Sequence, residues 1–133
     1  MTDTTSRPIG SIVWADLTVD DADHVRDFYR EVVGWTSSDV DMGGYRDYCM
    51  NQPGDARTVA GVCHARGANA GLPPQWLVYV IVEDLDASMQ KCVELGGTIV
   101  SPVRRSGAEG RYVVVRDPAG AAIALFEDEP PAA

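Results

Sequence analysis

The chain has 133 residues, 45% of them hydrophobic and 23% charged, which is close to the average for soluble globular domains. This composition argues against collagen, coiled coil and a wholly disordered chain, and no run approaches the roughly 20 apolar residues of a membrane-spanning helix. The formal net charge of −9 disfavours nucleic acid as a partner, because the phosphate backbone would be repelled.

The chain start and the cysteines indicate the cellular compartment. The first nine residues contain no apolar run, so no secretory signal is visible. Cys49, Cys63 and Cys92 form neither a CxxC pair nor an even set. We therefore expect reduced thiols in a cytoplasmic protein with no membrane partner.

The first half of the chain carries the signals of one strand, one helix and three further strands. The apolar run 11–19 predicts the first strand. Helical spacing follows over 22–32, with Asp21 as the expected N-cap and Gly34 as the stop, since glycine adopts the left-handed conformation at little cost. Short strands are then predicted at 35–38, 45–51 and 58–63.

The second half repeats this order of signals. Asp21 aligns with Asp84, and Gly34 aligns with Gly97, at one common offset. A strand is predicted at 76–82, and helical spacing begins at Leu85 behind the N-cap Asp84. Further strands are predicted at 98–103, 111–116 and 122–126.

These signals predict an α+β fold of tandem βαβββ repeats. The expected organisation is a first module at 1–64, a linker at 65–75, a second module at 76–127 and a frayed tail at 128–133. The linker is rich in Gly, Ala and Pro, and the tail contains Pro130-Pro131.

This tandem repeat resembles the vicinal oxygen chelate superfamily, which includes glyoxalase I, extradiol dioxygenases, methylmalonyl-CoA epimerase and bleomycin-binding proteins. The pieces that carry the resemblance are Val19-x-Asp21, Phe28-Tyr29, Gly34-Trp35 and the stretch 116–120. The resemblance implies two cupped mixed sheets that form a barrel-like cavity around a small-molecule ligand. A homodimer is also expected, because such cups pair through symmetric edges.

The resemblance further implies four positions that hold a divalent metal ion in metal-dependent members. In this chain they are Trp14, Gly61, Leu77 and Ala124. None of these side chains offers the oxygen or imidazole donors that such ions need. We therefore expect a site without metal or other cofactor, and neither glyoxalase I nor extradiol dioxygenase activity.

Strand alternation selects the candidate site residues. The side chains expected to bind a ligand are Trp14, Thr18, Tyr48, Trp76, Leu77 and Tyr79. Asp16 is the first catalytic candidate, because a carboxylate desolvated beside Trp14 could act as a general base. His64, at the end of a strand, is the second. The alternatives are that Asp16 is hydrogen-bonded or open to water, and that His64 is a polar strand end.

Three functions are compatible with these residues. The first is a metal-free cavity for a hydrophobic or aromatic metabolite, polyketide-like or quinone-like, in a binder or a metal-independent acid/base enzyme. The second is a metal-dependent lyase, isomerase or dioxygenase with displaced ligands, for which the donors would be Asp16, Cys63, His64 and Glu127. The third is a non-catalytic, dimerising interaction module.

Overall fold

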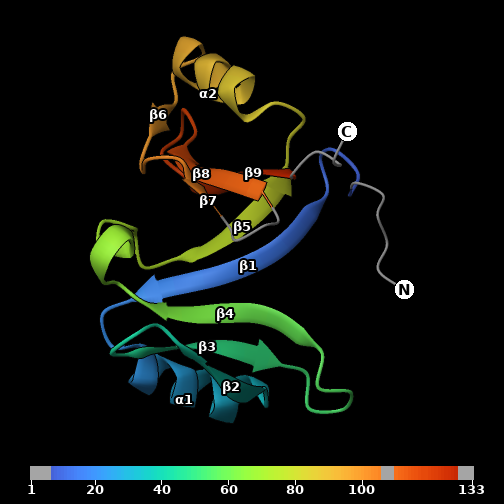
Figure 1. The fold of residues 1–133 in the computed structure, drawn as a ribbon, viewed down its shortest axis with the longest axis vertical. Helices are drawn as coiled ribbons and strands as arrows, with labels where there is room; N and C mark the ends of the chain where they lie inside the picture. The colour runs from blue at the N-terminus through green and yellow to red at the C-terminus, as the bar shows by residue number, and fades with distance from the viewer. Residues whose placement is uncertain (1–6, 106–109, 129–133) are drawn as a thin grey trace. The chain divides into compact units, whose positions relative to one another are not determined.

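The computed structural model describes residues 7–105 and 110–128 (Figure 1). These ranges contain nine strands and two α-helices, which confirms the predicted α+β class. The chain divides into two compact units, one of Trp14–Leu77 and the other of the segments before and after it. Neither helix in the described ranges is long and apolar enough to cross a membrane.

The unit Trp14–Leu77 is a four-stranded sheet with one helix. Its elements are β1 (Ile12–Val19, from Trp14 on), α1 (Ala22–Val33), β2 (Thr36–Asp41), β3 (Arg46–Asn51) and β4 (Thr58–His64). β1 pairs with β4 in parallel, whereas β4 with β3 and β3 with β2 are antiparallel. This is the strand and helix order that the sequence predicts.

Local signals set the ends of α1. The carboxylate of Asp21 accepts a hydrogen bond from the backbone N–H of His24 at 3.1 Å. At the other end Gly34 has a φ of 90°, and its N–H bonds to the carbonyl of Arg30. Both are the caps expected from the sequence, because they satisfy backbone groups that a helix end leaves unpaired.

The helix covers one face of this sheet. The buried residues of the core beneath it are Ala22, Tyr48, Met50, Ala60 and Val62. Three rings pack against this core, since Tyr29 lies 5.3 Å from Trp76 and 5.9 Å from Trp35 between ring centroids. The indole Nε1 of Trp76 donates to the hydroxyl of Tyr29 at 3.0 Å. The residues that alternate with this core along the strands therefore point to the opposite face of the sheet.

The second unit repeats the arrangement. Its elements are β5 (Trp76–Ile81, from Val78 on), α2 (Leu85–Glu94), β6 (Thr98–Ile99), β7 (Arg104–Arg105), β8 (Gly110–Arg116) and β9 (Ala122–Asp128). β5 pairs with β9 in parallel, and β8 pairs antiparallel with β9, β6 and β7. The core under α2 is formed by Leu85, Val113 and Val115. The predicted N-cap Asp84 accepts from the N–H of Ala87 at 3.1 Å.

One predicted strand of this unit is wrong in its extent. The sequence predicts a continuous strand at 98–103, but the structure has β6 and β7 with a break between them. At the break, the hydroxyl of Ser101 accepts from the N–H of Val114 at 3.1 Å, so a side chain replaces a backbone partner. Pro102 follows and has no N–H to donate to the sheet.

The predicted module boundaries stay a prediction. The compact units divide within β1 and within β5, and residues 7–13 belong with the second unit, where the N–H of Gly10 bonds to the carbonyl of Ile81. The expected linker contains a short 3₁₀ turn (Gly67–Asn69). Asp128 ends β9 and pairs with Arg7, whereas the rest of the predicted tail lies outside the described residues.

Candidate functional site

Two predicted site residues lie together on the sheet face that points away from α1. Leu17 pairs with Val62, which belongs to the core under the helix, so strand alternation places Asp16 and Gly61 on the other face. The indole Nε1 of Trp14 donates a hydrogen bond to Oδ2 of Asp16 at 3.2 Å. The carboxylate is therefore held by a ring from its own strand.

Gly61 makes this arrangement possible. It is the register partner of Asp16 in the neighbouring strand β4. A Cβ atom at Gly61 would lie 3.2 Å from the Cβ of Asp16 and 3.3 Å from Cζ2 of Trp14. These distances are tighter than ordinary van der Waals contact, so the indole rests directly on the glycine backbone. A Cβ at this position would make the Asp16 side chain or the indole shift slightly.

The residues at the four implied metal positions do not fit a divalent ion. The indole of Trp14 lies over Gly61, as described above, and Leu77 and Ala124 are both fully buried hydrophobic residues. Elsewhere in the described ranges, no group of three or more His, Cys, Asp and Glu side chains is placed to hold a metal ion. These four positions thus offer hydrocarbon and indole groups instead of the carboxylate and imidazole ligands that a divalent ion needs.

Thr18 and Cys63 continue the same face. They are register partners, and Thr18 is buried. Burial raises the pKa of the Cys63 thiol far above its ordinary value, and the nearby carboxylates of Asp16 and Asp47 raise it further. Because a thiolate is the reactive form, Cys63 is a poor nucleophile at neutral pH.

The second unit carries an aromatic cluster on its face away from α2. Tyr79 pairs with Ala124, and Tyr112 pairs with Phe126. The ring of Tyr112 lies 5.4 Å from that of Tyr79 and is stacked on Phe126, with an interplanar angle of 8°. The guanidinium of Arg7 lies 5.3 Å above the ring of Phe126. Of the predicted site residues, Tyr79 thus lies in this aromatic cluster of the second unit.

Two predicted ligand-binding residues lie on the α1 side instead. Tyr48 was expected to line the cup, but it pairs with Val62 and packs in the core under the helix, where its hydroxyl donates to Asp23. Trp76 packs against the same core. The reason in each case is the strand register, which sends these side chains toward the helix.

The two catalytic candidates do not come together. His64 follows Cys63 at the end of β4 and contacts groups on the α1 side, with Nε2 3.7 Å from the carboxylate of Asp23. Asp16 lies on the face away from α1. A single reacting atom therefore cannot lie within hydrogen-bond reach of both groups.

Sequence reasoning missed two residues that shape these faces. Phe126 completes the aromatic cluster, and alternation along the last predicted strand could have placed it beside Tyr112. Asp47 is a buried carboxylate that accepts from the N–H of His64 at 2.8 Å. Its role depends on the register between β3 and β4, which no local signal in the sequence supplies.

A family comparison agrees with this fold. The family model described as the glyoxalase/bleomycin resistance protein/dioxygenase superfamily matches residues 11–125. The chain belongs to this superfamily.

Individual relatives extend the comparison. CFP32 of Mycobacterium bovis, provisionally named a glyoxylase, is 34% identical over 119 residues, which cover 89% of this chain and 46% of CFP32. The anthracycline biosynthesis protein DauV of Streptomyces sp. strain C5 is 33% identical over 122 residues, covering 89% of this chain and 42% of DauV. The chain thus spans less than half the length of these curated relatives.

A solved structure shows the likeness of the fold. Methylmalonyl-CoA epimerase from Mycobacterium tuberculosis is similar with a TM-score of 0.53 and 21% sequence identity, covering 98% of this chain and 94% of the epimerase. At this level of identity the likeness concerns the fold alone, because one fold can carry many functions.

The contact between Trp14 and Gly61 can be tested by adding one methyl group. Gly61→Ala places its Cβ against Trp14 and Asp16, so we expect the free energy of unfolding to fall by about 1–3 kcal/mol, as is typical for overpacking. Urea denaturation followed by circular dichroism measures this change. Gly54→Ala is the matched control, because a Cβ there meets nothing within 4 Å and should leave stability nearly unchanged. Equal stabilities of the two variants would contradict the close contact.

Proposed function

We propose that this chain binds a small, largely hydrophobic or aromatic metabolite without a metal ion, on the sheet face that carries Trp14 and Asp16. The observation that carries this proposal is the indole of Trp14 lying over Gly61 and bonding to Asp16. This arrangement puts a flat apolar ring and a carboxylate where the superfamily's metal-dependent members are expected to place ligands.

The chemistry of the face favours an aromatic ligand with a polar group. An indole offers a large stacking surface, and aromatic pairs add to the gain from simple area burial. A carboxylate can accept several hydrogen bonds, so Asp16 can receive a hydroxyl or N–H of the ligand besides the indole of Trp14. The relative DauV is named for anthracycline biosynthesis, which supports a planar aromatic compound as the ligand class.

The same face also supports metal-independent acid/base chemistry as a second step. A carboxylate fixed by the hydrogen bond from Trp14 is a general base that can take a proton from a bound ligand. His64 has no part in this step, because it lies on the α1 side of the sheet. The proposal therefore assigns the acid/base role to Asp16 alone.

The metal-dependent alternative has less support. Its donors would be Asp16, His64, Cys63 and Glu127. Asp16 and His64 lie on opposite faces of one sheet, and Glu127 is engaged by the guanidinium of Arg111 at 2.8 Å and by the N–H of Leu85. The Arg111 hydrogen bond lowers the pKa of Glu127, which keeps this carboxylate in its ion pair.

A homodimer is the assembly that we propose. Superfamily members commonly bind small molecules and form dimers. Sedimentation equilibrium of the purified chain tests this point, and a monomer at micromolar concentration would contradict it.

The ligand proposal is tested with a planar aromatic probe, the hydroxyanthraquinone alizarin. We expect saturable binding in calorimetry and at least a roughly tenfold loss of affinity in Trp14→Ala, which corresponds to about 1.4 kcal/mol. Asp16→Asn keeps the shape of the side chain but removes its charge. If Asp16 acts as a base on a true substrate, this variant should retain binding and lose turnover.

Phe28→Ala is the matched control for this test. It also truncates an aromatic side chain, but Phe28 is an exposed residue of α1, on the other side of the sheet. Its affinity for the probe should equal that of the unaltered protein. Unchanged affinity in Trp14→Ala, or an equal loss in Phe28→Ala, would contradict the proposed face.

A further inference from the structure

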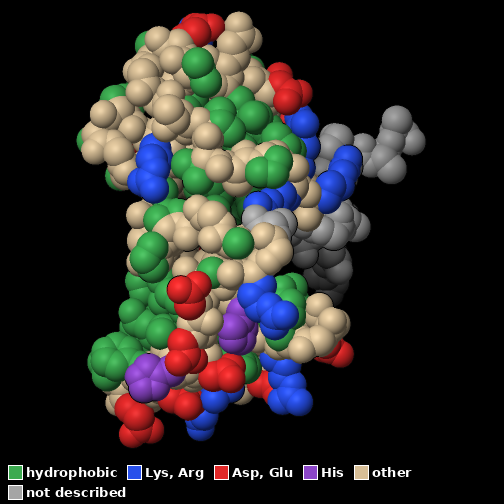
Figure 2. All heavy atoms as spheres, turned by 90° about the vertical axis from the view of Figure 1, so that its left-hand side faces the viewer, with side chains coloured by type: hydrophobic (Ala, Val, Ile, Leu, Met, Phe, Trp, Pro, Cys, Tyr) green, Lys and Arg blue, Asp and Glu red, His purple; other side chains and the backbone are tan. Residues whose placement is uncertain are grey.

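A second site lies on the α1 side of the first unit, at the end of β4. It is a pocket of about 380 Å³ lined by Asp23, Tyr45, Arg46, Tyr48, His64 and Arg66. Figure 2 shows both histidine side chains of the chain on one face, among acidic and basic side chains. The proposed aromatic ligand does not use this pocket, because Trp14 and Asp16 lie on the opposite side of the sheet.

Aromatic rings position arginine side chains at and beside this pocket. The guanidinium of Arg66 lies 4.1 Å above the ring of Tyr45, which in turn contacts His64 edge-on at 5.6 Å. Beside the pocket, the guanidinium of Arg26 lies 4.4 Å above the ring of Tyr48 and pairs with Asp27. Cation–π contacts of this kind limit the freedom of long arginine side chains before any ligand binds.

The buried carboxylate of Asp47 contacts both the backbone and the ring of His64. Oδ1 of Asp47 accepts from the backbone N–H of His64 at 2.8 Å and lies 3.4 Å from its Nδ1. On the far side, Nε2 lies 3.7 Å from Asp23, which also accepts from the hydroxyl of Tyr48. The imidazole therefore has a defined orientation, and the charge of Asp23 is partly engaged by its own neighbours.

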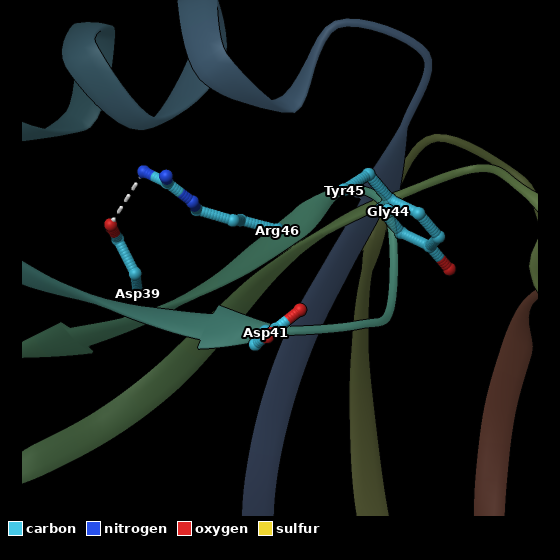
Figure 3. Close-up of a pocket in the computed structure, with 5 residues that line it drawn as sticks. All are labelled: Asp39, Asp41, Gly44, Tyr45 and Arg46. Carbon is cyan, nitrogen blue, oxygen red and sulfur yellow. Dashed lines mark hydrogen bonds and ion pairs between the residues drawn. The ribbon is translucent and has the colours of Figure 1, made fainter.

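The two arginines at the pocket supply positive charge that the protein does not fully use. In the part of the chain that the structure describes, Arg66 makes no salt bridge with a carboxylate and only stacks on Tyr45. Arg46 pairs with Asp39 at 3.1 Å, but both side chains are more than half exposed, and such pairs are weak. Figure 3 shows Arg46 directed toward Asp39, with the ring of Tyr45 pointing elsewhere. Arg46 can thus exchange its partner.

From this geometry we propose that the pocket binds the oxyanion of a small molecule, a carboxylate or a phosphate. Guanidinium groups bind both through paired N–H donors, and Arg46 and Arg66 flank the same pocket. On a chain of net charge −9, an oxyanion site requires such a local concentration of cationic groups.

The test is a titration of ¹⁵N-labelled protein with inorganic phosphate and, separately, with acetate, at constant ionic strength set with sodium chloride. We expect saturable amide shifts confined to the neighbourhood of Arg46, His64 and Arg66 with at least one of the two anions. The anion that binds identifies the source of the oxyanion. Absence of saturable shifts with both anions would overturn the proposal.

Charge variants decide whether the pocket itself is responsible. Arg66→Gln should raise the dissociation constant about tenfold, since a hydrogen bond to a charged group is lost. Arg57→Gln removes the same charge from the exposed turn between β3 and β4 and should leave the constant unchanged. An equal effect of the two variants would show general charge attraction and would also overturn the proposal. Thermal melts of both variants verify that the fold is retained.

Discussion

The contact of the Trp14 indole with the backbone of Gly61 is the constraint on which the proposed site depends. Two parallel strands bring these residues together, and the absence of a Cβ at Gly61 leaves room for the ring. The indole N–H then reaches the carboxylate of Asp16. One glycine thus leaves room for the ring that donates a hydrogen bond to the acid.

This constraint changes what the superfamily fold can do in this chain. A metal centre needs several oxygen or nitrogen donors that converge on one point. Here the indole of Trp14 fills the space beside Gly61. Burial and nearby carboxylates raise the pKa of Cys63 on the same face, which favours the neutral thiol. What remains on this face is the indole of Trp14 with the carboxylate of Asp16 beside it, and Asp47 lies near Cys63. In the function that we propose, such a surface would recognise a ligand by stacking and hydrogen bonding rather than by chelation.

Much of the fold follows from local sequence signals. Capping acids, stop glycines and apolar spacing predict both helices and the starts of most strands, because each signal acts within a few residues. The break between β6 and β7 was missed, since it depends on the hydroxyl of Ser101 reaching Val114 in a distant strand. Local patterns contain no information about such a partner.

The strand faces of the candidate site residues were predicted in part, and the reason is strand register. Alternation along β1 correctly separates Asp16 from Leu17, because burial of one face determines the other. In β3, alternation alone could not decide which set of residues faces α1, and Tyr48 lies under the helix although the opposite face was expected. His64 likewise became separated from Asp16 only once the register of β4 was known. Pairing between strands, rather than pattern within one strand, thus determines which candidates meet.

The most direct measurement of the central claim is the metal content of the protein. Protein purified without an affinity tag would be analysed by inductively coupled plasma mass spectrometry and titrated with Ni²⁺, Mn²⁺, Zn²⁺ and Fe²⁺ while its melting temperature is followed. The account predicts less than about a tenth of an equivalent of metal. It also predicts no change in melting temperature, because only a metal ion that binds the folded state would raise its stability. Binding near one equivalent with a raised melting temperature would contradict it.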